Sequence, residues 1–136
     1  VSARQAGIDT LVIPADRYFK SMAQAIIASD DTIRSQPALV GKFVRATLKG
    51  MKDILADPHA AAADYIKAVP SYAGREKYVE EVLKLYDDTV YRGQARPGEV
   101  DRSRVAALQG FYLKEGIIGK ETPVDELFTN QFIPAK

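Results

Sequence analysis

Cysteine is absent from the chain, and histidine occurs once, as His59. The lack of cysteine excludes disulfide bonds, thiolate catalysis and cysteine-ligated zinc. His59 has no second histidine with which to bind a metal or build a triad, so we expect it on a solvated surface. No apolar run approaches the roughly 20 residues of a membrane-spanning helix. We therefore predict no metal site, no cofactor and no catalytic residue.

The chain also carries little net charge. Its 19 Lys and Arg residues nearly balance its 18 Asp and Glu residues, and no basic run is interleaved with aromatic residues. This pattern predicts no nucleic-acid partner. The 136 residues are 46% hydrophobic and 27% charged, which is typical of one folded domain with its own core. Because the chain opens on Val1 without a leader pattern, we expect it to be part of a longer protein.

Two short apolar runs are typical of β-strands. Residues 8–13 are rich in isoleucine, leucine and valine and stop at Pro14. Residues 23–28 form the second run, in which the alanines leave a buried helical turn as an alternative. Two strands alone are marginal in water. We therefore expect them to pair with further strands, either of a longer protein or of a second copy.

Four segments predict helices. Apolar residues recur every three or four positions from 37 to 56, with basic residues between them. The helical pattern resumes at 58–68 and continues at about 75–91 and 102–115, the last two separated by a loop rich in Gly and Pro. Together with the strands, these segments predict an α/β fold that is mostly helical.

Several acidic and hydroxyl residues stand where helices are expected to begin. Asp30 and Asp31 raise the question of a carboxylate site, but adjacent side chains point apart in a strand or helix. Ser and Asp oxygens at a helix start accept backbone N–H bonds and stabilise it by about 0.5–2 kcal/mol. We therefore predict that Ser29, Asp30, Asp57 and Asp101 are structural caps.

The order and spacing of several motifs resemble one protein family. An apolar run is followed by a Ser-x-x-x-Ile turn, a helix that starts at proline, an Asp-Pro break and a terminal Asp-x-Leu-Phe-x-Asn-x-Phe segment. The matching residues are Ala25–Ala28, Ser29, Ile33, Pro37, Phe43, Val44, Ala46, Asp57, Pro58, Asp125, Leu127, Phe128, Asn130 and Phe132. Over about 8–134 the chain resembles the C-terminal half of ABC-transporter substrate-binding proteins of the nitrate/sulfonate/thiamine-precursor type.

This resemblance implies a type II periplasmic-binding-protein fold and a receptor rather than an enzyme. Such a receptor captures a small organic or inorganic anion, such as nitrate or a taurine-like sulfonate, or a thiamine-precursor-like molecule. It delivers that ligand to a membrane permease from the periplasmic or extracytoplasmic side.

The resemblance also implies how the chain is organised. Residues 1–136 would form one domain, with 1–20 as a segment crossing between two lobes and 21–136 as one lobe. A polar and aromatic set at the crossing is expected to line the ligand cleft: Asp16, Arg17, Tyr18 and Phe19.

Two alternatives remain at this level. The chain would be an oligomerising helical module or truncated-gene product without a ligand, in which case unpartnered strands predict a dimer or larger assembly. Alternatively, it would resemble the fungal thiamine-precursor synthases, in which a lysine-bound pyridoxal phosphate and a histidine supply atoms. Only Lys20 and His59 are candidates for those roles.

Overall fold

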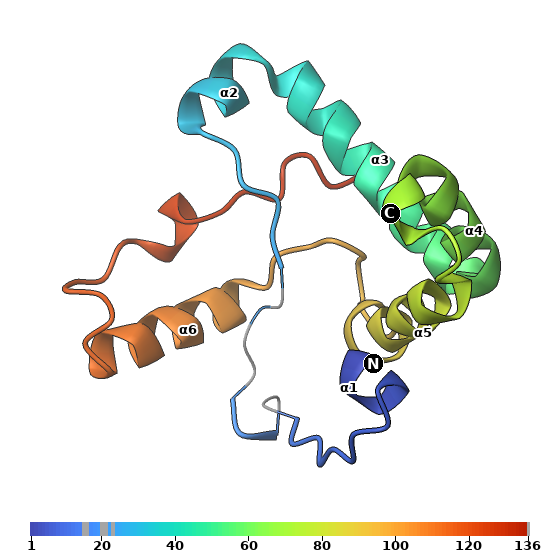
Figure 1. Cartoon of the computed structure of the whole chain (residues 1–136). Coiled ribbons are helices and arrows are strands. Elements are labelled where there is room, and N and C mark those ends of the chain that lie inside the picture. The colour runs from blue at the N-terminus through green and yellow to red at the C-terminus, as the bar shows by residue number, and fades with distance from the viewer. Residues whose placement is uncertain (15–16, 20–21, 23, 136) are drawn as a thin grey trace. The chain divides into compact units, whose positions relative to one another are not determined.

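The computed structural model describes residues 1–14, 17–19, 22 and 24–135, and its elements are helical (Figure 1). Short 3₁₀ turns lie at Pro70–Tyr72 and Val124–Glu126, and a π-helical turn lies at Asp87–Tyr91. None of the described helices has the length and apolar character needed to cross a membrane. The α-helices are α1 (Ser2–Gln5), α2 (Asp30–Ser35), α3 (Pro37–Ala56), α4 (Pro58–Ala68), α5 (Glu76–Tyr86) and α6 (Arg102–Lys114).

The four longest helices follow the periodicity of the sequence closely. Helices α3 and α4 have the expected bounds, and α6 ends at Lys114, one residue early. The expected range 75–91 divides into α5 and the π-helical turn. Local signals explain this agreement, because Asp57 Oδ1 accepts N–H bonds from His59 and Ala60, both at 3.0 Å, at the start of α4.

The prediction of two strands, and with it the α/β class, is wrong. No strand forms within the described residues, and 8–13 and 24–28 are irregular. Leu11 is 88% exposed and Ile27 is 92% exposed. A strand is stabilised by pairing with a neighbouring strand and by burial of its side chains, whereas the described residues of these runs pair with no strand and are largely exposed. Their aliphatic composition alone therefore does not produce a strand.

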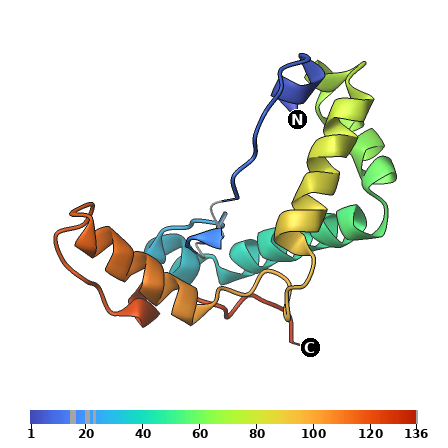
Figure 2. The same ribbon diagram turned by 90° about the horizontal axis from the view of Figure 1, so that it is seen from below.

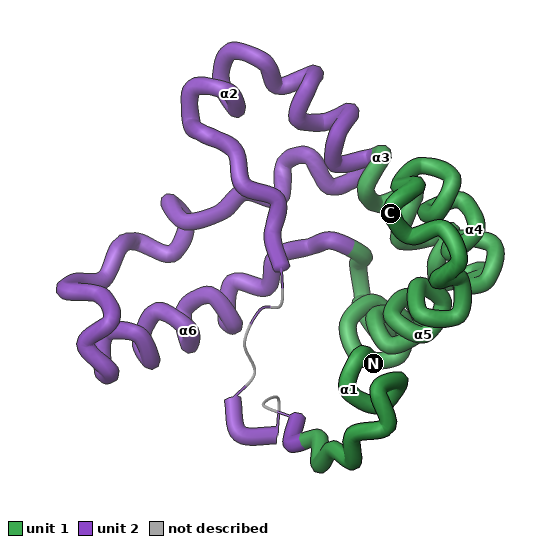
Figure 3. The backbone as a smooth tube through the Cα atoms, viewed as in Figure 1, with its two compact units in different colours: residues 1–12, 46–97 green, residues 13–45, 98–136 purple. Residues whose placement is uncertain are grey.

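The chain divides into two compact units (Figure 3). Unit 1 comprises residues 1–12 and 46–97, and unit 2 comprises residues 13–45 and 98–136. The start of α3 belongs to unit 2 and its remainder to unit 1. The assignment of 1–136 to one domain with a crossing segment at 1–20 stays a prediction.

Unit 1 is built on a helix pair. Helices α4 and α5 lie side by side in both views (Figures 1 and 2). Ala62 of α4 is 2% exposed and Val79 of α5 is 4% exposed, so the two helices share a small apolar core. Helix α1 is held to α5 by polar contacts, since Ser2 Oγ donates to Tyr78 Oη at 3.3 Å. The small alanine side chain lets the two helices approach closely.

An aromatic cluster covers one part of unit 1. The rings of Tyr65 and Tyr72 meet edge to face with centroids 5.4 Å apart, and those of Tyr72 and Tyr78 are stacked at 6.4 Å. The Arg75 guanidinium lies 4.3 Å from the Tyr78 centroid. Rings at helical spacing, partly exposed and in mutual contact, stabilise the rim of the helix pair.

Unit 2 is held together by side chains that each make two bonds. Arg102 donates to both carboxylate oxygens of Asp125, at 2.8 and 3.2 Å. The Gln109 amide bonds both backbone groups of Thr122, at 2.8 and 2.9 Å. The Asn130 amide bonds both backbone groups of Val100, at 2.9 and 3.0 Å. These three clasps fasten the irregular C-terminal segment along α6 and the loop before it.

The start of α3 supplies the apolar part of unit 2. Val40 and Val44 are buried, and Gly41 lies next to Phe132 of the C-terminal segment. A Cβ atom at position 41 would meet the Phe132 ring at 3.6 Å and the Arg45 guanidinium at 3.1 Å. The contact with Phe132 is an ordinary packing distance, so an alanine at position 41 would mainly require the flexible end of the Arg45 side chain to shift slightly.

Candidate functional site

The expected ligand-binding segment is partly described, since Asp16 lies outside the described residues. The Arg17 backbone N–H donates to the Pro14 carbonyl at 3.2 Å and closes a turn. Phe19 is half-buried, and its ring lies 4.9 Å from that of Phe111 on α6, tilted by 33°. Tyr18, which lies between Arg17 and Phe19 in the sequence, is 80% exposed. The structure thus anchors the segment at Phe19 and leaves the adjacent tyrosine accessible.

This arrangement suits recognition of a flat or anionic molecule. An accessible phenol ring offers a stacking face, and the exposed Arg17 guanidinium offers planar N–H donors. The Phe19–Phe111 contact fixes the backbone from which both side chains project. Phe111 is the member that sequence reasoning missed, because its place beside Phe19 depends on tertiary packing.

The residues predicted as caps lie at helix starts. Ser29 Oγ accepts the Thr32 N–H at 3.2 Å, and Asp101 Oδ1 accepts the Ser103 N–H at 2.8 Å and the Ser103 hydroxyl at 2.6 Å. These bonds from Ser103 hold the pKa of Asp101 below its ordinary value. Asp30, expected to cap beside Ser29, is instead the first residue of α2, where a carboxylate suits the positive end of the helix.

A charged hollow in unit 1 is a second feature that the sequence did not predict. It encloses about 420 Å³ between the α3–α4 junction and the end of α5. His59 Nδ1 lies 2.8 Å from Glu80 Oε2, and Arg92 is paired with Asp87. His59 is exposed, as expected, but it is ion-paired to another helix when protonated. Neither pair joins residues at a spacing that marks a motif.

The His59–Glu80 pair predicts a pH-dependent contribution to stability. The hydrogen bond to Glu80, and then its charge, raise the pKa of His59 above its ordinary 6.5. A raised pKa in the folded state means that the stabilisation is complete below the unfolded pKa and is lost as pH rises through the folded pKa. Because the chain has one histidine, its ring proton signal reports this titration by NMR without assignment.

The expected result is a titration midpoint above that of the urea-unfolded chain. Glu80→Gln should bring the midpoint back toward the ordinary value. Glu81→Gln is the matched control, because Glu81 accepts a bond from Gln5 and not from His59. An equal effect of the two substitutions would contradict the pairing.

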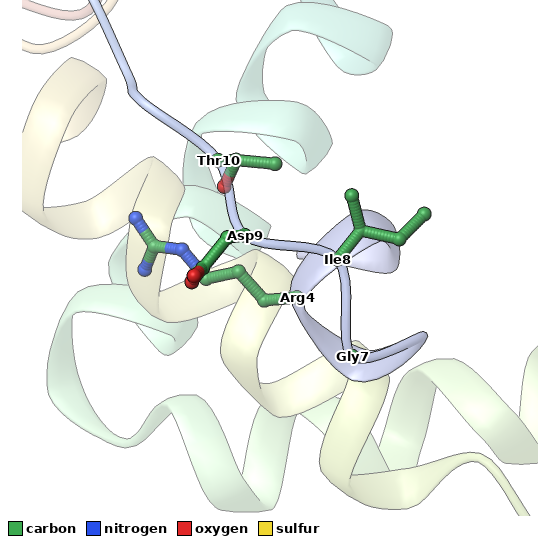
Figure 4. A pocket seen from close by; sticks show the side chains of 5 residues that line it. All are labelled: Arg4, Gly7, Ile8, Asp9 and Thr10. Carbon is green, nitrogen blue, oxygen red and sulfur yellow. The ribbon is translucent and has the colours of Figure 1, made fainter.

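A second, smaller hollow of about 240 Å³ lies at the turn after α1. Figure 4 shows the side chains of Arg4 and Asp9 on one side of the backbone and Ile8 on the other. Its lining residues lie close together in sequence (residues 4 and 7–10) and are largely exposed. A local turn of this kind holds no distinct chemistry. Elsewhere in the described part of the chain, no three His, Asp or Glu side chains are placed to hold a metal ion.

Comparison with known proteins relates the chain to a protein family and to a binding protein. An NMT1/THI5-like family model matches residues 1–61. A riboflavin-binding protein, RibY, of Chloroflexus aurantiacus is 28% identical over 139 residues, which covers 98% of this chain and 39% of that protein. The chain thus spans about two fifths of this relative's length. No solved structure gives a significant match.

Proposed function

We propose that this chain, which fits a fragment of an ABC substrate-binding protein of the NMT1/THI5-like type, is part of the solute receptor of an importer. In this proposal the protein is extracytoplasmic, binds a small molecule and passes it to a membrane permease. The family model and the relative's name point to a binding protein rather than an enzyme. In the synthase alternative His59 would have to act while its Nδ1 is paired with Glu80, and Lys20 lies outside the described residues.

The proposed ligand is a planar heteroaromatic molecule. The relative is named as a riboflavin-binding protein, and stacking on a tyrosine is a common way to hold a flat ring system. The observation that carries the proposal is the exposed Tyr18 beside the anchored Phe19. In this proposal Tyr18 stacks on the ligand, Arg17 bonds its polar edge, and Phe19 and the neighbouring Asp16 complete the contact.

The experiment is a fluorescence titration of riboflavin with the chain and with any longer protein that carries it. Stacking quenches flavin emission, so a saturable loss of emission is expected. Tyr18→Ala should weaken binding by about 2- to 13-fold, as expected for the loss of an aromatic pair. Tyr65→Ala removes an exposed ring of unit 1 and should leave the affinity unchanged.

The outcomes separate the parts of the proposal. Unchanged flavin emission together with a thermal shift by taurine or nitrate would keep the receptor and reject the planar ligand. Equal weakening by Tyr18→Ala and Tyr65→Ala would reject Tyr18 as a contact. No response to any of these solutes from the longest available protein would reject the receptor function.

A second candidate is an oligomerising module. The exposure of Leu11, Val12 and Ile13 in one run, and of Ile27 in another, favours it, since contiguous accessible apolar surface marks association sites. Light scattering at micromolar concentration should then give the mass of a dimer or larger, and Leu11→Lys with Ile27→Lys should reduce it to that of a monomer. A monomeric mass for the unsubstituted chain would reject this candidate.

A further inference from the structure

Asp87 is a buried acid, and one of its two carboxylate oxygens has no hydrogen-bond donor among the described protein atoms. The residue is 3% exposed. Its Oδ2 atom accepts from the Arg92 guanidinium, whereas Oδ1 is buried and has no hydrogen-bond partner among the described protein atoms. A buried acceptor without a donor is costly, and the cost is greater for a charged oxygen. Such a group therefore requires an explanation in a native structure.

The backbone around Asp87 holds this residue in place. Asp87 opens the π-helical turn, and the Arg92 N–H donates to the Asp87 carbonyl at 3.0 Å to close it. Arg92 thus holds Asp87 twice, through its backbone and through its guanidinium. Turns of this kind are rare and occur frequently at functional sites. Arg92 bonds Oδ2, and Oδ1 is the carboxylate oxygen that it does not bond.

Asp87 lines the charged hollow of unit 1, and the other carboxylates there are differently engaged. Asp57 caps α4, and Glu80 is paired with His59. Asp88 is exposed at the same rim.

Four carboxylates face two permanent cations, Lys84 and Arg92, so the lining has an excess of negative charge that favours a cation.

We propose that this hollow binds a small organic ammonium ion, which donates an N–H bond to Asp87 Oδ1 once the side chains that cover this buried atom have shifted. An alkylammonium group carries up to three N–H donors on one centre, as a lysine side chain does, so it satisfies Oδ1 and turns its other donors toward solvent. The described residues offer no set of three His, Asp or Glu side chains placed to hold a metal ion. This site is independent of the proposed ligand segment, which belongs to unit 2.

The test uses putrescine as the probe, titrated into the purified chain at low salt and followed by amide NMR. Saturable shifts are expected in residues 55–59 and 80–92. Asp87→Asn keeps the shape of the side chain and should weaken binding by about tenfold or more, the loss expected for a charged hydrogen bond. Asp88→Asn is the matched control, because Asp88 is adjacent and exposed, and it should weaken binding less than threefold.

A further variant keeps the proposal testable if Asp87→Asn does not fold. Lys84→Gln removes a competing positive charge from the hollow, so putrescine should bind more tightly to it than to the unsubstituted chain. Potassium chloride at equal ionic strength distinguishes a specific ammonium site from general cation attraction. The proposal is overturned if no saturable shifts appear, if potassium reproduces them, or if Asp87→Asn folds and binds unchanged.

Discussion

Ala62→Asp should unfold unit 1 or lower its free energy of unfolding by about 3 kcal/mol or more. Ala62 is 2% exposed in the contact between α4 and α5. A carboxylate placed there loses its hydration without gaining a partner, and it also forces the helices apart. Small domains have only about 5–15 kcal/mol of stability in total, so this is a large fraction. Urea denaturation followed by far-UV circular dichroism measures the loss.

Ala63→Asp provides the matched control for this substitution. Ala63 belongs to the same helix and is exposed, so both variants share the intrinsic helix cost of about 0.7 kcal/mol or less. The difference between the two variants therefore isolates the burial of position 62. If the two variants lost equal stability, the packing of α4 on α5 would be contradicted.

The helices could be predicted because their signals are local. In α3 and α4 the 3.6-residue period and the Asp57–Pro58 start lie within the helices themselves. The strand prediction failed for the converse reason. A run such as 8–13 has aliphatic residues, but a strand also needs hydrogen-bonding partners from other parts of a fold. Within the described residues no such partner is present, and the run stays irregular.

The candidate sites show the same difference between features that the sequence marks and features that depend on tertiary packing. Arg17, Tyr18 and Phe19 were predicted through the family resemblance, and their role stays a prediction. The contact of Phe19 with Phe111 and the burial of Asp87 depend on tertiary packing, which no spacing in the sequence announces. Asn130 combines a sequence signal with a tertiary contact. The family motif marked its position, and the structure shows that its amide bonds the backbone of Val100.

Asn130→Asp should lower the free energy of unfolding by about 1–3 kcal/mol at neutral pH. The Asn130 amide donates to the Val100 carbonyl at 3.0 Å and accepts the Val100 N–H at 2.9 Å. A carboxylate still accepts the N–H but brings a second oxygen against the carbonyl, leaving a half-buried acceptor without its donor. The C-terminal segment then loses one of its three clasps. Thermal denaturation measures the loss, and faster exchange of the Val100 amide locates it.

Two further measurements make this prediction specific. Gln131→Glu makes the same amide-to-carboxylate change at the exposed neighbouring residue and should stay within about 0.5 kcal/mol of the unsubstituted chain. A protonated carboxyl regains an O–H donor for the Val100 carbonyl, so the deficit of Asn130→Asp relative to the unsubstituted chain should shrink as the pH falls below the pKa of the new carboxyl group. A deficit independent of pH, or one shared by Gln131→Glu, would show that the Asn130 clasp does not hold the segment. The acid-dependent recovery is the sharper result, because simple loss of packing would not depend on protonation.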